Sequence, residues 1–335
     1  MNFHGKDIKI FTGSSNVPVA QGIAGCLGLP LGKCTCQKFS DGEISVTINE
    51  SVRGSECFIV QSTCTPVNDN LMEMLIMIDA MKRASAARIT AVMPYFGYAR
   101  QDRKAKPRDP ISSKLCADII TAAGADRLLT MDLHANQIQG FFNIPVDHLK
   151  GAGILADHMK EKVGDNADEY VVVSPDLGSV TRARNFASKI GTSLAIIDKR
   201  RPKANVSEVM NIIGDVKGKK VIILDDMISS GDSMLEVGSE LRKRGAGRIF
   251  FCATFGLFTD GLDRFDKAYK EGLFDRVVTT NLIYQTPELL EREWYINCDM
   301  SKYIAYIIDT LNHDASISDL LNPTDRIQRL LASRS

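Results

Sequence analysis

The apolar residues of this chain fall into short runs that alternate with longer segments of helical periodicity. Residues 221–224 form an unbroken β-branched and aliphatic run, which predicts a strand buried on both faces of a parallel sheet. Asp225 and Asp226 follow where this strand is expected to end, and a loop of small residues, Ser229 to Ser233, comes next. Because ligands collect at the carboxyl ends of strands in open α/β sheets, these residues predict a ligand site.

The small-residue loop precedes a predicted helix whose apolar positions begin at Met234. Hydroxyl side chains and closely spaced backbone N–H groups at a helix N-terminus are suited to binding an anion. The predicted helix ends in three cations, residues 242–244, followed by Gly245, so its dipole is complemented and a glycine cap is available. The alternative is an ordinary strand–turn–helix unit that begins with a serine cap.

The same order of strands and helices occurs twice, at an offset of about 160 residues. The predicted strand at residues 9–11 corresponds to residues 171–173, and that at residues 57–60 corresponds to residues 221–224. A further pair of strands ends near Gly97 and Gly256, which makes chance recurrence a poor explanation. The sequence therefore predicts an α/β fold with two duplicated domains, each a mainly parallel sheet flanked by helices.

Gly151 and Gly153 interrupt the pattern and mark the expected domain boundary. We expect a first domain at residues 1–150, a second at residues 151–310, and a tail at residues 311–335 that packs on the first domain. The tail contains a polar turn around residues 313–318.

Two acidic strand ends are candidate metal sites. Asp132 and His134 follow the predicted strand at residues 127–131, and strand alternation would place them on one face, where they could share Mg²⁺ and a nucleotide phosphate. A histidine with a structural role is the alternative for this pair. Asp176, after the predicted strand at residues 170–173, is either a second metal carboxylate or a turn cap.

Two basic loops also follow predicted strands. Residues 98–110 hold five cations in a segment interrupted by prolines, which suggests a polyphosphate clamp, with a solvated basic loop as the alternative. Residues 198–206 hold four more, Lys199, Arg200, Arg201 and Lys203. Phosphoryl transfer needs concentrated positive charge, and a loop that closes over the reactants excludes water.

Composition narrows the class of protein. The chain has 335 residues, 44% of them hydrophobic, and its 41 basic and 41 acidic residues cancel, so no overall field attracts nucleic acid or an anionic membrane. We find neither an apolar signal segment at the N-terminus nor an 18-residue apolar run, so secretion and membrane spanning are not expected. Eight scattered cysteines fit a reducing cytoplasm. A P-loop motif is absent, so ATP would have to be held in another way.

The central stretch, KKVIILDDMISSGDSM at residues 219–234, resembles the ribose-5-phosphate loop of type I phosphoribosyltransferases. Together with FSDGE at residues 39–43 and the two basic loops, the chain resembles the ribose-phosphate diphosphokinase (phosphoribosyl pyrophosphate synthetase) family. The resemblance implies two type I phosphoribosyltransferase-like domains. It also implies transfer of the diphosphoryl group of ATP to the 1-hydroxyl of ribose 5-phosphate, with Mg²⁺ as cofactor.

The resemblance further assigns roles to individual residues. The ATP-binding residues would be Phe39, Asp41, Gly42, Glu43, Arg100, Gln101, Asp102 and His134, the first four acting on adenine, often from a neighbouring subunit. His134 and Asp176 would serve two magnesium sites, with Asp132 as a further candidate. Lys199 and Arg201 would be catalytic. The sugar phosphate would be bound by Asp225, Asp226, Ser229, Ser230, Gly231, Asp232 and Ser233.

The family also implies assembly and regulation. We expect a homo-oligomer, at least a dimer and by resemblance a hexamer. A phosphate or ADP effector site would be formed by Ser51, Arg53, Ser85, Ser316 and Ser318. A simple helix cap at Ser316 is the alternative.

Several residues depart from the family pattern. Asp232 places a negative charge beside a dianionic phosphate, and it should weaken sugar binding unless it points outward. Ser229 and Asn143 replace more usual aspartates, and residues 258–284 are unusually charged. A weakly active or regulatory homologue and a phosphoribosyltransferase therefore remain as alternative functions.

Overall fold

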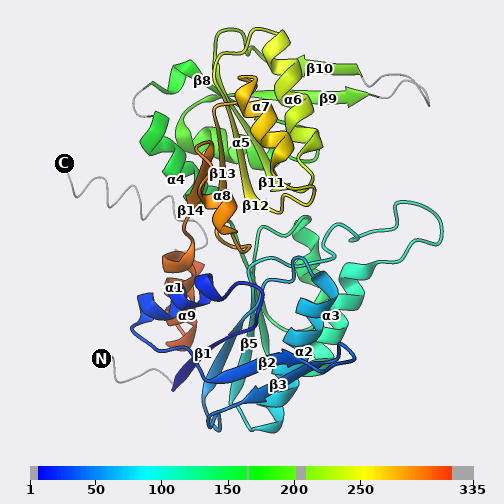
Figure 1. Ribbon diagram of the computed structural model, residues 1–335, viewed down its shortest axis with the longest axis vertical. Helices are drawn as coiled ribbons and strands as arrows, with labels where there is room; N and C mark the ends of the chain where they lie inside the picture. The colour runs from blue at the N-terminus through cyan, green and yellow to red at the C-terminus, as the bar shows by residue number, and fades with distance from the viewer. Residues whose placement is uncertain (1–6, 164–165, 201–208, 319–335) are drawn as a thin grey trace. The chain divides into compact units, whose positions relative to one another are not determined.

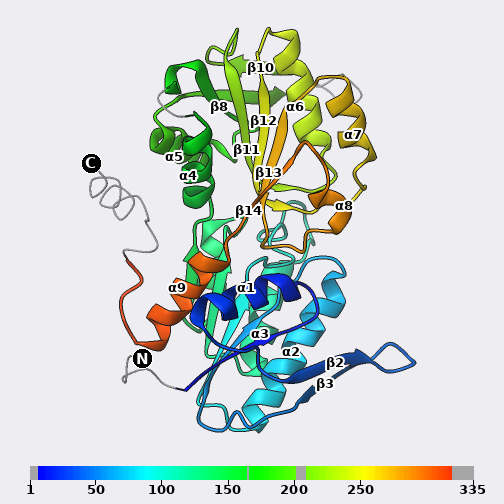
Figure 2. The same cartoon turned by 60° about the vertical axis from the view of Figure 1, so that its left-hand side comes forward.

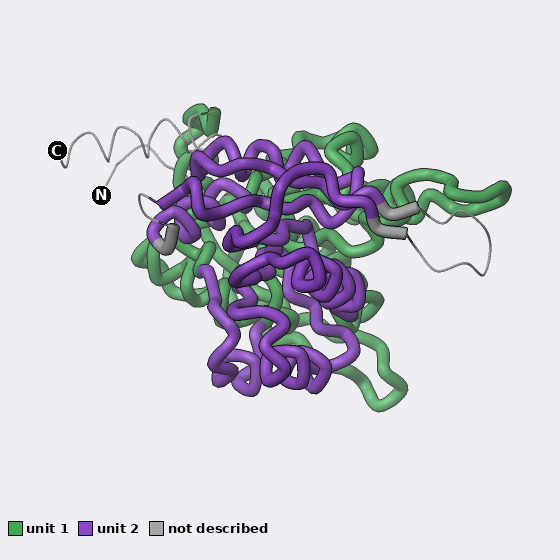
Figure 3. Tube along the Cα trace, turned by 90° about the horizontal axis from the view of Figure 1, so that it is seen from above, with its two compact units in different colours: residues 1–150, 282–284, 299–335 green, residues 151–281, 285–298 purple. Residues whose placement is uncertain are grey.

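The computed structural model describes residues 7–163, 166–200 and 209–318, and its chain divides into two units. The first unit consists of Met1–Lys150, Leu282–Tyr284 and Asp299–Ser335, and the second of Gly151–Asn281 and Gln285–Cys298 (Figures 1 and 3). Within the described ranges, no helix has the length and apolar character needed to cross a bilayer.

The first unit is built on a parallel sheet whose described strands have the order β1-β4-β5-β6-β7. These strands are β1 (Ile8–Thr12), β4 (Glu56–Val60), β5 (Arg88–Met93), β6 (Arg127–Met131) and β7 (Val146–Leu149). The helices are α1 (Val17–Leu27), α2 (Val67–Arg83), α3 (Ser112–Ala123), the 3-10 helix η1 (Asn136–Phe141) and α9 (Ser301–Asn312). Helices α1 and α9 cover one face of the sheet, and α2 and α3 cover the other (Figure 1).

A separate antiparallel hairpin of the first unit joins β2 (Cys34–Lys38) to β3 (Ile44–Ile48). Strand β3 lies against α2, and the turn of the hairpin projects from the rest of the unit (Figure 2). The hairpin comes between the first helix and the second core strand of the unit.

The second unit contains a larger sheet, with the described strands in the order β10-β9-β8-β11-β12-β13-β14. Its strands are β8 (Tyr170–Ser174), β9 (Ser193–Arg200), β10 (Val209–Ile213), β11 (Lys220–Ile228), β12 (Ile249–Gly256), β13 (Arg276–Thr280) and β14 (Tyr295–Cys298). Its helices are α4 (Ala152–Val163), η2 (Ala167–Glu169), α5 (Val180–Ile190), α6 (Asp232–Lys243), α7 (Asp263–Lys270) and α8 (Pro287–Leu290). All neighbouring strands are parallel except β9 and β10.

The two sheets repeat one topology. The order β1-β4-β5-β6-β7 has its counterpart in β8-β11-β12-β13-β14, and the hairpin β2–β3 corresponds in chain position to β9–β10. In the second unit β9 pairs with β8 and so joins the main sheet, whereas β2–β3 stays separate. The α/β fold with two duplicated, mainly parallel domains is confirmed.

Two expectations about the elements need correction. The second domain was expected to run to residue 310, but α9 belongs to the first unit because it packs on α1. The two helices approach so closely that a Cβ at Gly22 would lie 2.6 Å from the hydroxyl oxygen of Ser301. Of the expected tail, residues 311–318 also lie in the first unit, and residues 319–335 fall outside the described part.

The central strand is also longer than expected. Asp225 and Asp226 do not follow the end of the strand, because β11 continues to Ile228 by pairing with β12 as far as Gly256. On its other side the pairing of β11 with β8 ends at Ile223. The two acidic residues therefore lie on a part of β11 that extends beyond β8.

A cluster of aromatic side chains packs α7 onto the core of the second unit. Phe265 of α7 is fully buried, stacks on Trp294 with ring centroids 5.6 Å apart, and meets Phe258 edge to face at 5.2 Å. These rings pack with the apolar side of α6 and with β11 and β12. The charged segment before β13 is therefore an amphipathic helix whose aromatic side belongs to the core.

Candidate active site

Asp225 and Asp226 share one cationic partner in the second unit. Their carboxylates each lie 3.8 Å from the same nitrogen of Arg182, which belongs to α5. Asp225 also accepts hydrogen bonds of 2.9 Å from the hydroxyl of Ser179 and from the backbone N–H of Asp226. Although successive strand residues point to opposite faces, both acidic groups reach Arg182.

The charge of this cluster is not fully balanced. Burial raises the pKa of Asp225 to about 7, and repulsion by Asp226 and Asp176 adds to the effect. A proton is therefore held on the pair at a pH where an ordinary aspartate has lost it. Such a site favours a bound divalent cation or hydroxyl donors, because either would stabilise the ionised form.

Asp176 is exposed in the turn that follows β8. Its carboxylate accepts a 2.8 Å hydrogen bond from the backbone N–H of Ser179, the residue that precedes α5. Its own carbonyl accepts a 2.7 Å hydrogen bond from the hydroxyl of Ser174. The turn-capping alternative is thus realised, and the same carboxylate remains at the surface beside Asp225.

The small-residue loop enters α6 through Gly231. This glycine has φ +89°, and a Cβ there would lie 2.4 Å from the ring of Phe265. Glycine is required both by the left-handed backbone and by the buried ring beneath it. A 3.0 Å hydrogen bond from the N–H of Thr259 to the carbonyl of Ser229 fixes the start of the loop. The first turn of α7 therefore supports the loop, because the ring of Phe265 packs against Gly231.

Asp232, the first residue of α6, is exposed and paired. One carboxylate oxygen meets the guanidinium of Arg264 from α7, and the other accepts a 2.8 Å hydrogen bond from the hydroxyl of Ser230. The hydrogen bond from Arg264 lowers the pKa of Asp232, so this carboxyl is ionised at neutral pH. Its negative charge, which was expected to oppose a phosphate, is compensated by a residue of the unusually charged segment.

Asp132 and His134 do not share a face, contrary to the expectation from strand alternation. Strand β6 ends at Met131, and Asp132 has φ +35°, which breaks the alternation. Asp132 is 3% exposed, and its charge adds to the burial that raises the pKa of Tyr303, whereas His134 is exposed. In the described ranges, no group of three or more His, Cys, Asp or Glu side chains is arranged to hold a metal.

The first basic loop is an exposed connection to α3. All five of its cations, Arg100, Arg103, Lys104, Lys106 and Arg108, are exposed. Gln101 anchors the loop: its carbonyl accepts hydrogen bonds from the N–H and hydroxyl of Ser113, and its side chain contacts Ser112. Asp102 is half-buried beside it. The cations are thus presented at the start of α3.

The FSDGE segment forms the turn of the β2–β3 hairpin. The N–H of Phe39 donates to the carbonyl of Glu43 at 2.8 Å, and Gly42 has φ +95°. Asp41 accepts a 3.1 Å hydrogen bond from the N–H of Glu43. The Phe39 side chain is 55% exposed. An exposed aromatic ring on a projecting turn is suited to stacking on a planar ligand.

The expected effector residues lie on three segments of the first unit. Ser51, Arg53 and Ser85 are exposed near the starts of β4 and β5, and the carbonyl of Ser85 accepts a 2.9 Å hydrogen bond from the N–H of Gly54. Ser316 and Ser318 are exposed after α9, and their hydroxyls are 3.0 Å apart. The oxygen of Ser316 also accepts from the N–H of Ser318 at 3.3 Å, as in the capping alternative.

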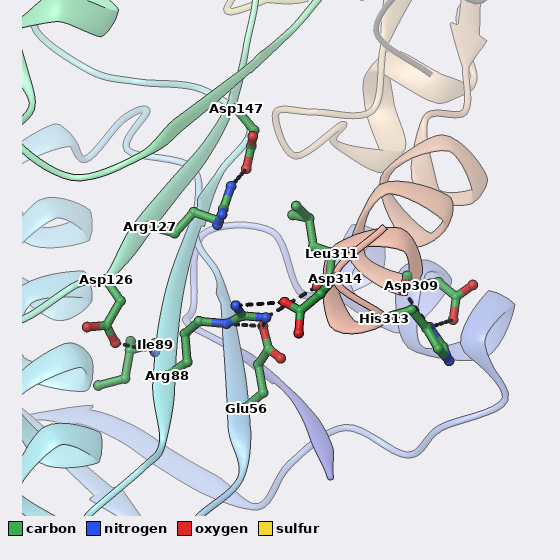
Figure 4. A network of polar contacts seen from close by, with 10 residues as sticks. All are labelled: Glu56, Arg88, Ile89, Asp126, Arg127, Asp147, Asp309, Leu311, His313 and Asp314. Atoms are coloured by element: carbon green, nitrogen blue, oxygen red, sulfur yellow. Dashed lines mark hydrogen bonds and ion pairs between the residues drawn. The ribbon is translucent and has the colours of Figure 1, made fainter. Parts of the chain in front are cut away.

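Arg88 connects these segments (Figure 4). It hydrogen-bonds to Glu56 at 2.6 Å, to Asp314 at 3.2 Å and to the carbonyl of Leu311 at 3.2 Å. The polar turn after α9 is therefore tied to the amino-terminal edge of the sheet, where Arg53 and Ser85 lie. Arg88 was not among the residues predicted to form the effector site.

Comparison with known proteins identifies the family. The profile of the N-terminal domain of ribose phosphate pyrophosphokinase matches residues 8–124, and that of the phosphoribosyl transferase domain matches residues 146–290. A ribose-phosphate pyrophosphokinase of Clostridium perfringens is 63% identical over 259 residues, covering 77% of this chain and 81% of the relative. The chain belongs to the ribose-phosphate pyrophosphokinase family.

Longer alignments and a solved structure agree with this. The ribose-phosphate pyrophosphokinase of Fusobacterium nucleatum is 47% identical over 323 residues, which cover 96% of this chain and all of that protein. The crystal structure of phosphoribosylpyrophosphate synthetase from Mycobacterium smegmatis matches with a TM-score of 0.85 and 38% identity, over 92% of this chain and all of that one. The resemblance inferred from the motifs is thus confirmed.

Two expected catalytic residues can be placed only in part. The backbone of Lys199 belongs to β9 and pairs with Met210 of β10. Arg201 lies outside the described residues. Lys199 and Arg200 were expected in a loop, but they lie on β9, the strand that corresponds in chain position to β2 before the FSDGE turn.

Sequence reasoning missed the arginines that complete these sites. Arg182 and Arg264 meet their acidic partners only through the packing of α5 and α7 on the sheet. The only sequence signal for Arg264 was that Asp232 lacked a counter-charge within an otherwise small and hydroxyl-rich loop.

Proposed function

We propose that this chain is a ribose-phosphate pyrophosphokinase that transfers the diphosphoryl group of ATP to the 1-hydroxyl of ribose 5-phosphate, giving phosphoribosyl diphosphate and AMP. The observation that carries the proposal is the pair Asp225 and Asp226 at the carboxyl end of β11, followed by the Gly231 loop at the start of α6. Carboxylates can accept hydrogen bonds from sugar hydroxyls, and a helix N-terminus binds a phosphate.

Each group of residues has a role in this proposal. Asp225 and Asp226 orient the sugar, and the loop formed by Ser229, Ser230, Gly231, Asp232 and Ser233 binds its 5-phosphate. The exposed ring of Phe39, with Asp41, Gly42 and Glu43, binds adenine. Arg100, Gln101, Asp102 and His134 bind ATP. Lys199 and Arg201 stabilise the charge that develops on the transferring group.

Magnesium fits the acidic residues of the second unit. The raised pKa of Asp225 reflects negative charge that a divalent cation would neutralise, and Asp176 lies at the surface beside it. Mg²⁺ commonly binds through one or two carboxylates together with substrate phosphates, so a cage of three protein ligands is not needed. When bound, the ion would offset the charge of the phosphates. In the first unit exposed His134 is the better candidate, since Asp132 is buried.

Assembly and regulation are also proposed. The adenine-binding turn projects from its unit, which suits completion of an ATP site in a neighbouring subunit of a dimer-based homo-oligomer, a hexamer by family resemblance. A phosphate or ADP effector would bind at Arg53, the serines near it, and the turn held by Arg88. The eight cysteines are free thiols, as a reducing cytoplasm would keep them. Sedimentation that finds a fully active monomer would contradict the assembly.

A coupled assay tests the proposed reaction. AMP should form from ATP only when ribose 5-phosphate is present, in equal amount to phosphoribosyl diphosphate. Formation of ADP instead would indicate transfer of a single phosphoryl group. Absence of AMP at high protein concentration would favour the inactive regulatory homologue.

A further inference from the structure

The carboxylate of Asp232 binds two donors at the loop proposed to bind the sugar phosphate. It accepts from the hydroxyl of Ser230 on one oxygen and from Arg264 on the other. The N–H of Asp232 itself lies 3.4 Å from the oxygen of Ser230. A hydroxyl and a guanidinium are the donors that a phosphate group would use.

Arg264 is held beside this loop by the packing of α7. The next residue, Phe265, is fully buried under Gly231, so the first turn of α7 cannot move away without opening the core. The Arg264 side chain itself is 49% exposed, and its other contact, to Asp260, is long at 3.9 Å. The backbone of Arg264 is thus fixed, whereas its guanidinium is free to change partners.

Charge favours such an exchange. An exposed ion pair contributes little to stability, so the contact between Arg264 and Asp232 is easily given up. A phosphate monoester near neutral pH carries more negative charge than a carboxylate and offers a guanidinium two oxygens at once.

From these contacts we propose that the guanidinium of Arg264 binds the 5-phosphate of ribose 5-phosphate. In the empty enzyme the carboxylate of Asp232 pairs with this guanidinium and so competes with the phosphate for it. This inference rests on the proposed role of the 229–233 loop as the phosphate site. It explains how a chain with Asp232 in this loop can still bind a dianion, because Arg264 neutralises the charge of Asp232 and is also available to the phosphate.

The test is the KM for ribose 5-phosphate at saturating ATP in four variants. Arg264→Gln should raise this KM about 5- to 10-fold with little change in kcat, as expected for a partly exposed charge-assisted contact. Asp232→Asn should lower it about 2-fold, because the competitor is lost. In the double variant the Arg264→Gln penalty should persist. Arg244→Gln is the control, since Arg244 is a partly exposed arginine that pairs with Glu240 at the opposite end of α6.

Two results would overturn the inference. An unchanged KM in Arg264→Gln would exclude a contact with the phosphate. A penalty that disappears in the Asp232→Asn background would mean that Arg264 only neutralises Asp232. Thermal melts of each variant show whether a raised KM reflects misfolding. Arg264→Lys keeps the positive charge, so it should retain part of the affinity for ribose 5-phosphate that Arg264→Gln loses.

A further pair of variants separates this inference from the proposed function of the loop. If Ser229→Ala and Ser230→Ala raise the KM while Arg264→Gln does not, only the role of Arg264 is wrong. If all three leave the KM unchanged, the loop is not the phosphate site and both proposals fail.

Discussion

One nitrogen of Arg88 lies 3.2 Å from the carboxylate of Asp314, which joins the start of β5 to the turn after α9. The same guanidinium pairs with Glu56, whose side chain is only 1% exposed and has one oxygen, Oε2, without a hydrogen-bond partner among the described residues. Arg88 is therefore the counter-charge of a buried carboxylate as well as the link to the polar turn.

Arg88→Ala should lower the free energy of unfolding by about 2–4 kcal/mol, because it leaves Glu56 buried and uncompensated. Chemical denaturation measures this directly. Adding Glu56→Gln should recover part of the loss, since the amide carries no charge to bury.

The matched control for Arg88 is Arg83→Ala. Arg83 pairs with Asp79 on the exposed surface of α2, and its removal should leave stability unchanged within error. Equal losses in the two variants would show that the burial of Glu56 is not what matters.

The Asp225 cluster predicts a pH-dependent stability. The pKa of Asp225 is about 7 in the folded protein and 3.8 for an ordinary aspartate, so between these values the folded state binds more protons than the unfolded state. Stability from this group is therefore full at low pH and is lost as pH rises through 7. Relative to Asp225→Asn, the wild type should lose Tm progressively between about pH 4 and pH 7.

Thermal melts across this range check the prediction, with exposed Asp215→Asn as the control. The difference between wild type and Asp225→Asn should widen toward high pH, and the variant should be the more stable protein there. A constant difference would contradict the raised pKa.

Gly231→Ala should destabilise the second unit more than Gly261→Ala does. Both glycines have positive φ, but a Cβ at Gly231 meets the buried ring of Phe265, while nothing lies within 4 Å of one at Gly261. The clash should add about 1–3 kcal/mol of overpacking to the backbone strain that both variants share. Denaturant unfolding of the two variants gives the comparison.

Activity should follow the same contrast. Because the clash moves the loop, Gly231→Ala should also raise the KM for ribose 5-phosphate, and Gly261→Ala should not. Similar unfolding curves for both would mean that α7 yields to the added methyl group.

Lys199→Ala should lower kcat by about 10²–10³, with little effect on the KM values, if this cation acts mainly on charge that develops in the transition state. Steady-state kinetics measures the effect, and a melt should show near-normal stability. Lys217→Ala, at an exposed lysine of the same unit, is the control. Near-normal turnover in Lys199→Ala would mean that other groups stabilise the charge that develops in the transition state.

The sequence predicted what depends on local pattern. Apolar runs located the strands, and their repetition identified the duplicated fold, because burial on both faces of a parallel sheet dictates such runs. The Gly231 loop was recognised because a tight turn needs glycine and a helix start needs small polar residues. These signals lie within a few neighbouring residues.

Features that depend on a distant partner were missed. The strand of Asp225 and Asp226 was expected to end too early, since β12 rather than local composition carries its pairing to Ile228. The left-handed backbone of Asp132 could not be read from strand periodicity. No sequence pattern connects Arg182 with Asp225 and Asp226, and the missing counter-charge of Asp232 did not by itself indicate which arginine would supply it.

The matching positions of β2–β3 and β9–β10 have an evolutionary consequence. If both halves descend from one ancestral gene, the exposed aromatic turn and the second basic loop began as the same hairpin and later specialised. The copy at β9–β10 is constrained by strand pairing with β8, whereas β2–β3 forms a sheet of its own that is held to its unit by side-chain packing, including that of β3 on α2. If the β2–β3 turn binds the nucleobase as proposed, substitutions confined to that turn should alter nucleobase preference while leaving the pairing of β9 with β8, and the proposed catalytic Lys199 on β9, unchanged.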